Sequence, residues 1–120
     1  MKKSMKTNPL LIQLISDLKK VSWVEKAPIW RDIAKRLEKS LQNRPEVNVS
    51  RIARYVKKGE TIIIPGKLLG AGDIDFPVTV AAFKASESAK KKIRDAGGKM
   101  ISIHELVKKN PKGSRVRIIG

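Results

Sequence analysis

Thr61-Ile62-Ile63-Ile64-Pro65-Gly66-Lys67-Leu68-Leu69 is the stretch of this sequence that decides the fold class. Its first four residues form a β-branched run, which predicts a strand because such side chains suit a pleated backbone better than a helix. Pro65-Gly66 is expected to end that strand, and residues 67–69 are expected to form another. A glycine-bearing loop then leads to a further strand candidate at residues 78–81.

Helical patterns precede this stretch. Asn8 can accept a hydrogen bond from the first helix amides, and Pro9 needs no donor at the first helical position. Apolar residues then recur at helical spacing to about Val21. Pro28 opens a second helix, whose apolar stripe extends to Leu41.

A short third helix lies directly before the strand stretch. Ser50 is expected to begin it and Gly59 to end it. Arg51, Arg54 and Lys58 then fall at positions i, i+3 and i+7, which places three cations on one helical face.

Helices and strands alternate after the strand stretch. A helix is expected over residues 86–96, and a strand over residues 100–103. Ser102 and Glu105 have the spacing of a capping box ahead of a short helix. A closing strand is expected over residues 115–119.

These patterns predict an α/β fold. A chain of 120 residues is long enough for one domain with a real core. We predict a single compact domain over residues 8–120, with a helical amino-terminal part followed by irregular strand-strand-helix turns. The basic residues 1–7 are expected to form an N-terminal tail.

The charge balance is the strongest indication of a partner. The chain has 27 Lys and Arg but only 11 Asp and Glu, which gives a net charge of +16 and a pI near 10.5. Self-repulsion at this density opposes compaction, so such a surface suits a polyanion. Nucleic acid is the natural candidate, because neutralising its phosphates releases counterions. The alternative is a solvated basic surface without a specific partner.

Several classes of protein are excluded or disfavoured. The chain has no cysteine, which excludes disulfides, thiolate zinc sites and cysteine nucleophiles. Residues 1–6 are basic and precede an apolar stretch at 10–15, but Gln13 and Asp17 interrupt that stretch and no cleavage site follows. We therefore expect a cytoplasmic protein with no membrane partner.

No catalytic constellation is visible. His104, the one histidine, has no obvious catalytic partner in the sequence and is expected at the surface or at a helix cap. Asp73 and Asp75 could ligate a metal, but two acids are a weak signal. Gly70 and Gly72 match only the start of a dinucleotide fingerprint, so they are expected to supply special backbone angles or a close approach to phosphate. We predict no enzyme, no metal, no cofactor and no small-molecule substrate.

The aromatic residues are few. Trp30 and Phe83 fall in apolar patterns and are expected in the core, whereas Trp23 and Tyr55 are candidates for base stacking. This scarcity favours binding to phosphates and shape over reading unpaired bases. A helix-turn-helix over residues 9–41 lacks the expected glycine in its turn.

Seven segments in chain order resemble one known family, the archaeal and eukaryotic large-subunit ribosomal protein eighteen-e. They are Thr7-Asn8-Pro9, Ala27-Pro28-Ile29-Trp30-Arg31, Arg44 to Ile52, Pro65 to Gly72, Pro77 to Ala82, Ala96-Gly97-Gly98-Lys99 and Asn110-Pro111-Lys112-Gly113-Ser114. The resemblance covers the chain from about Thr7 to its end, and residues 67–97 also resemble the related bacterial protein fifteen. The compact length is similar to that of archaeal members.

The resemblance implies a structural constituent of the large ribosomal subunit, with large-subunit ribosomal RNA and neighbouring ribosomal proteins as partners. Basic side chains would neutralise closely packed RNA backbones, while glycine-bearing loops fit between RNA helices. The expected rRNA contacts are Lys2, Lys3, Lys6, Arg51, Arg54, Lys67, Lys99, Lys112, Arg115 and Arg117. The alternative that shares this charge is a small DNA-binding chromatin or regulatory protein.

Overall fold

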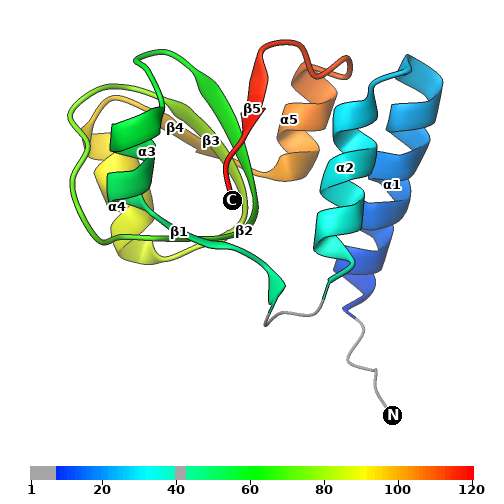
Figure 1. The fold of residues 1–120 in the computed structure, drawn as a ribbon, viewed down its shortest axis with the longest axis horizontal. Helices are drawn as coiled ribbons and strands as arrows, with labels where there is room; N and C mark the ends of the chain where they lie inside the picture. The colour runs from blue at the N-terminus through cyan, green and yellow to red at the C-terminus, as the bar shows by residue number, and fades with distance from the viewer. Residues whose placement is uncertain (1–7, 40–42) are drawn as a thin grey trace.

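A computed structural model describes residues 8–39 and 43–120 of the chain. Within these residues lie five helices and five strands, and the strands form one parallel sheet (Figure 1). The helices are α1 (Pro9–Glu25), α2 (Pro28–Leu37), α3 (Val49–Tyr55), α4 (Glu87–Asp95) and α5 (Ile103–Lys109). The strands are β1 (Glu46–Asn48), β2 (Thr61–Leu69), β3 (Thr79–Ala85), β4 (Lys99–Ile101) and β5 (Val116–Ile118). The predicted α/β class is confirmed.

Strand β2 is the centre of the sheet. It pairs with β3 along one edge, and β3 pairs in turn with β4. Its other edge is shared by two short strands, because β5 pairs with residues 61–63 and β1 with residues 67–69. The amino-terminal ends of β2, β3, β4 and β5 therefore lie in one row, and the carboxyl ends of β1, β2 and β3 in another.

Helices cover both faces of the sheet (Figure 1). Ile63 of β2 belongs to a core shared with α1, α2 and α5, and that core contains the fully buried Trp30. Ile62 and Ile64 belong to a second core, shared with α3 and α4. Successive residues of a strand point to opposite faces, so a continuous isoleucine run suits a strand that is buried on both sides.

The expected break at Pro65-Gly66 is wrong. Strand β2 continues through both residues, and its register against β3 shifts between Ile64 and Lys67. Proline has no amide donor, and it is tolerated in a sheet at such an irregularity. The carbonyl of Pro45 packs against Gly66 and accepts a hydrogen bond from the Lys67 amide at 3.0 Å. A hydrogen bond to the segment before β1 thus holds β2 in place at Pro65-Gly66, where the local sequence predicted the end of the strand.

The predicted helix starts at Asn8, Pro28, Ser86 and Ser102 are confirmed. The side chain of Asn8 accepts from the Leu10 amide at 2.9 Å, and Pro28 is the first residue of α2. Ser86 accepts from the Ala89 amide, and Ser102 forms a complete capping box with Glu105. Each of these caps involves residues close together in the chain, so the sequence alone predicts them.

Helix α3 is shorter than expected. It begins at Val49, after Asn48, and ends at Tyr55, where Val56 returns to an extended conformation. Gly59 therefore lies in the following turn with φ of +81° rather than at the helix end. Lys58 lies outside the helix, so only Arg51 and Arg54 form the predicted row of cations. Leu41, expected to extend the α2 stripe, lies outside the described residues.

Candidate nucleic-acid interface

The positive charge of this protein is only partly balanced by its own carboxylates. Three of the 27 lysines and arginines (Lys2, Lys3 and Lys6) lie outside the described residues. Of the other 24, seven form ion pairs with Asp or Glu, so 17 have no carboxylate within 4 Å in the described part of the chain. In every one of these pairs at least one side chain is 48% exposed or more, and an ion pair in contact with solvent stabilises little.

One basic site lies at the carboxyl ends of β2 and β3. Lys67 and Lys84 are register partners on these two strands, and both side chains are exposed. They line a pocket of about 770 Å³ together with Lys90 and Arg94 of α4. We call this the carboxyl-end pocket. Like charges directly opposite each other in a sheet repel, so this pair is an unfavourable feature of the free protein.

The acids that line the carboxyl-end pocket do not pair with Lys67, Lys84 or Arg94. Glu87 pairs with Lys90 at 3.2 Å, and the Glu105 carboxylate accepts from the Ser102 amide in the capping box. Glu46 is the register partner of Lys67 on β1, but the two form no ion pair within 4 Å. Lys67, Lys84 and Arg94 therefore stand without a carboxylate partner among the described residues.

A second basic surface lies at the amino ends of the strands. Lys99 of β4 is the register partner of Thr79, which pairs with Thr61, and Thr61 pairs with Val116. The row ends beside Arg115, which has a φ of +61°, and Arg117. We call this row, with the turn at residues 57–59, the amino-end surface.

Arg117 connects the amino-end surface to helix α3. Its Nη1 donates to the Tyr55 carbonyl at 2.6 Å and lies 3.4 Å from the Glu60 carboxylate. Arg54 lies over the exposed ring of Tyr55, with its Cζ 5.9 Å from the ring centroid. Arg51 and Arg54 are both exposed, so α3 extends the basic surface away from the sheet.

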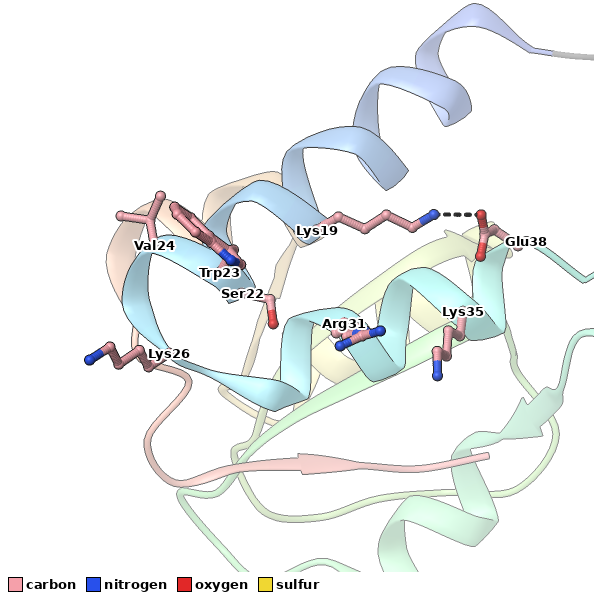
Figure 2. A pocket seen from close by; sticks show the side chains of 8 residues that line it. All are labelled: Lys19, Ser22, Trp23, Val24, Lys26, Arg31, Lys35 and Glu38. Atoms are coloured by element: carbon pink, nitrogen blue, oxygen red, sulfur yellow. Dashed lines mark hydrogen bonds and ion pairs between the residues drawn. The ribbon is translucent and has the colours of Figure 1, made fainter.

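A third basic site is a groove of about 940 Å³ between α1 and α2, shown in Figure 2. We call it the α1–α2 groove. It is lined by Lys19, Ser22, Trp23, Val24, Lys26, Arg31, Lys35 and Glu38. Lys19 and Glu38 form an ion pair of 2.8 Å across it.

Lys112 lies near the turn that joins α1 to α2. Its Nζ is 3.8 Å from a carboxylate oxygen of Glu25. The turn at residues 110–114, which carries Lys112 and joins α5 to β5, is fixed on α2, because the carbonyl of Pro111 accepts a hydrogen bond of 2.7 Å from the Trp30 indole, and Gly113 packs against Ile29. This segment is thus held by the fold, with Lys112 exposed at its tip.

The predicted contact residues within the described ranges lie on several surfaces and do not form a single site. Lys67 lies in the carboxyl-end pocket, whereas Lys99, Arg115 and Arg117 lie at the opposite ends of the strands. Sequence reasoning missed Lys84, Arg94, Arg31 and Lys35 as members of basic sites. These cations are visible in the sequence. Which residues lie beside them depends on strand register and helix packing, which the sequence pattern does not give.

The glycines at 66, 70 and 72 have reasons within the protein. A Cβ at Gly70 or Gly72 would overlap Ser88 or Ser50, respectively, and Gly72 has a φ of +90°. Nζ of Lys92 donates to the carbonyls of both Gly70 and Gly72. The loop is therefore packed and fastened from α4.

Asp73, a candidate metal ligand, and His104, a candidate catalytic residue, both have contacts within the fold. Lys92 lies 3.7 Å from the exposed carboxylate of Asp73, and no group of three His, Asp or Glu that could hold a metal occurs among the described residues. His104 is exposed, as predicted, and its Nε2 lies 3.2 Å from an oxygen of Asp17, which joins α5 to α1. Ser102, near His104 in the chain, serves as a helix cap.

No helix within residues 8–39 and 43–120 is both long and apolar enough to span a bilayer.

The chain is similar to known proteins over nearly its whole length. A family model described as ribosomal protein 60S L18 and 50S L18e matches residues 2–120. A protein of Methanococcus maripaludis named large ribosomal subunit protein eL18 is 52% identical over 119 residues, which is 99% of each chain. Proteins of the same name from Methanoregula boonei and Archaeoglobus fulgidus are 56% and 49% identical over 114 residues. Each of these two alignments covers 95% of this chain. They cover 94% of the Methanoregula boonei protein and 97% of the Archaeoglobus fulgidus protein.

Proposed function

Because the chain belongs to the family of ribosomal proteins 60S L18 and 50S L18e, we propose that it is a structural constituent of the large ribosomal subunit. The matches confirm the family resemblance carried by the seven sequence segments, and the archaeal relatives agree with the compact length. Its proposed partners are large-subunit rRNA and neighbouring ribosomal proteins, in the cytoplasm.

The observation that carries the RNA-binding proposal is the surplus of unpaired cations. Seventeen Lys and Arg side chains in the described residues lack a carboxylate within 4 Å, and all of them except Arg44 are exposed, on several surfaces of the molecule. A compact fold with so much uncompensated charge is expected to bind a polyanion on more than one side. Closely packed rRNA helices offer phosphates on several sides at once.

The proposed mechanism is electrostatic. Phosphates would enter the carboxyl-end pocket and relieve the repulsion between Lys67 and Lys84. Other phosphates would lie along the amino-end surface, at Lys99, Arg115 and Arg117, and along α3 at Arg51 and Arg54. Lys2, Lys3, Lys6 and Lys112 remain predicted contacts.

Two glycines support a close approach of RNA to the backbone. At Gly59 no atom lies within 4 Å of the position that a Cβ would occupy, and at Gly97 the nearest atom is 3.8 Å away. Both residues are exposed and lie near cations of the amino-end surface, Lys58 and Lys99. We propose these two positions, rather than the packed glycines at 66, 70 and 72, as the glycine-bearing contacts.

We also propose that the protein is not an enzyme and takes no small-molecule substrate or cofactor. The family is a structural one, and the acids most suited to a metal, Asp73 and Asp75, lie in a loop beside Lys92. The DNA-binding alternative shares the charge, but no feature of the described residues favours duplex DNA over RNA.

The proposal is tested by sedimenting a native cell extract through a sucrose gradient, with and without a high-salt wash, and probing for this chain. Co-migration with the large subunit is expected. Recovery only in light fractions or with chromosomal DNA would overturn the ribosomal assignment and favour the DNA-binding alternative.

A further inference from the structure

Trp23 is exposed without a structural reason in the described chain. Its residue is 84% accessible, whereas Trp30 is fully buried. Helix α1 buries Leu14, Leu18 and Ser22, and Trp23 lies off that face. An indole is one of the largest apolar groups a protein can bury, so a fold that leaves it in water does not draw stability from it.

Trp23 lines the α1–α2 groove together with basic side chains from both helices. Lys19 and Trp23 are four residues apart on α1, and Arg31 and Lys35 are four residues apart on α2, so each pair shares a helical face. The ion pair between Lys19 and Glu38 closes one end of the groove. Figure 2 shows Trp23 nearer the other end, with Lys26 projecting from the turn between the helices.

The charged side chains that line the α1–α2 groove indicate which kind of ligand it can bind. Its one carboxylate, Glu38, already pairs with Lys19. Lys26, Arg31 and Lys35 have no ion-pair partner within 4 Å in the described residues. An occupant should therefore combine negative charge with a flat apolar surface for the indole. The groove volume of about 940 Å³ is within the range of sites that hold small ligands.

We propose that the α1–α2 groove binds an unpaired nucleotide of the RNA, with its base stacked on Trp23 and its phosphates near Arg31, Lys35 and Lys26. This inference rests on the proposed function. A base within a duplex has both faces covered by its neighbours, so only an unpaired or bulged nucleotide can offer a face to the indole. Every base has such a face, and the contact needs no particular sequence.

The two tryptophans make the proposal measurable by fluorescence. Trp30 is buried and donates to the Pro111 carbonyl at 2.7 Å, so its emission reports the folded core and not the groove. Stacking on a base is expected to quench only Trp23. The probes are a GC-rich RNA duplex with one bulged adenosine and the same duplex without the bulge.

The bulged duplex is expected to quench the emission and to bind about fivefold to a hundredfold more tightly than the plain duplex. Trp23→Leu should remove the quenching and the preference, whereas Trp23→Phe should keep part of the preference. Leu10→Ala is the matched control, because Leu10 is also on α1, is 78% exposed and lies outside the groove. Thermal unfolding of each variant shows that it is folded.

Filter binding to large-subunit rRNA separates the inference from the proposed function. If the unaltered chain fails to bind this rRNA, the proposed function itself fails. If it binds rRNA but neither duplex alters Trp23 emission, the stacking inference is overturned, as it would be for a groove that holds a neighbouring protein. An equal loss of preference in Leu10→Ala would overturn it as well.

Discussion

Arg44 shows how a cation in a family motif can serve the fold rather than the RNA. Its Nη2 donates to the Leu37 carbonyl at the end of α2, at 2.8 Å. Its guanidinium lies over the Phe83 ring of β3, 5.2 Å from the centroid. Burial lowers the pKa of Arg44 below its ordinary value, but an arginine starts so high that it stays charged at physiological pH. The residue therefore fastens the chain before β1 to both a helix and the sheet.

Replacing Arg44 should destabilise the protein. We expect Arg44→Ala to lower the free energy of unfolding by about 2 kcal/mol, since a hydrogen bond from a charged group and a cation–π contact are both lost. Arg44→Lys keeps the charge but not the planar fork, and it should cost about half as much. Urea denaturation measures both variants. An Arg44→Ala protein as stable as the parent would show that these contacts contribute nothing.

Gly66 is a second residue whose role is steric. A Cβ there would overlap the Pro45 carbonyl, which is already bonded to the Lys67 amide. Gly66→Ala must push β1 away from β2, and we expect a loss of about 2–3 kcal/mol. Gly59→Ala is the control, because it has open space but a φ of +81°, and its cost should be nearer 1 kcal/mol. Thermal or urea unfolding that ranks the two variants in the reverse order would contradict this explanation.

At the scale of the helices and strands, local signals predicted the structure well. The caps at Asn8, Ser86 and Ser102 involve atoms two or three residues apart, so the sequence contains the whole interaction. The course of β2 through Pro65 could not be read in this way. It depends on β1, β3 and β5, which lie elsewhere in the chain and supply hydrogen bonds around the proline. The end of α3 was misplaced because Gly59 is needed for a turn and not for a helix cap.

The pairing of β2 with β3 makes a prediction that separates stability from binding. Lys67 and Lys84 repel across the strands, so Lys84→Gln should raise the free energy of unfolding of the isolated protein by a few tenths of a kcal/mol. The same change should weaken rRNA binding several-fold, because one phosphate contact is lost. Paired measurements of urea unfolding and filter binding test this. Lower stability, or unchanged affinity for rRNA, would count against a phosphate site at the carboxyl-end pocket.

Helix α3 carries another predicted contact surface. Arg51 and Arg54 are exposed, whereas the buried residues of α3 are Val49 and Ile52. The double charge reversal Arg51→Glu and Arg54→Glu should therefore weaken rRNA binding at least tenfold with little change in the midpoint of thermal unfolding. The control is Lys20→Glu with Lys39→Glu, which changes the net charge equally at exposed positions outside the three basic sites. A lower melting temperature would mean that this face of α3 serves the fold, and equal losses in both proteins would mean that only net charge matters.

At the scale of the whole molecule, composition predicted the kind of partner but not the layout of the sites. A charge of +16 indicates a polyanion wherever the cations lie. Lys67 was recognised from its motif, but Lys84 lies opposite it only through strand register. Trp23 and Arg31 line one groove only because α1 and α2 lie side by side. Lys99, Arg115 and Arg117 lie at the opposite ends of the strands from Lys67. Tertiary contacts determine which cations lie beside one another, and the sequence pattern does not show those contacts.

The distribution of cations over several surfaces predicts a steep dependence of binding on salt. If six to ten phosphates are neutralised, the affinity for large-subunit rRNA should fall by about a thousandfold or more between 50 and 200 mM salt. Lys67→Gln combined with Lys84→Gln should flatten the logarithmic slope by about two phosphate contacts, because it removes charge from the carboxyl-end pocket. Trp23→Leu should leave the slope unchanged and lower the affinity equally at each salt concentration, since stacking releases no counterions. A flat response of the unaltered protein would contradict the electrostatic mechanism, and an unchanged slope in the double lysine variant would exclude phosphate binding at that pocket.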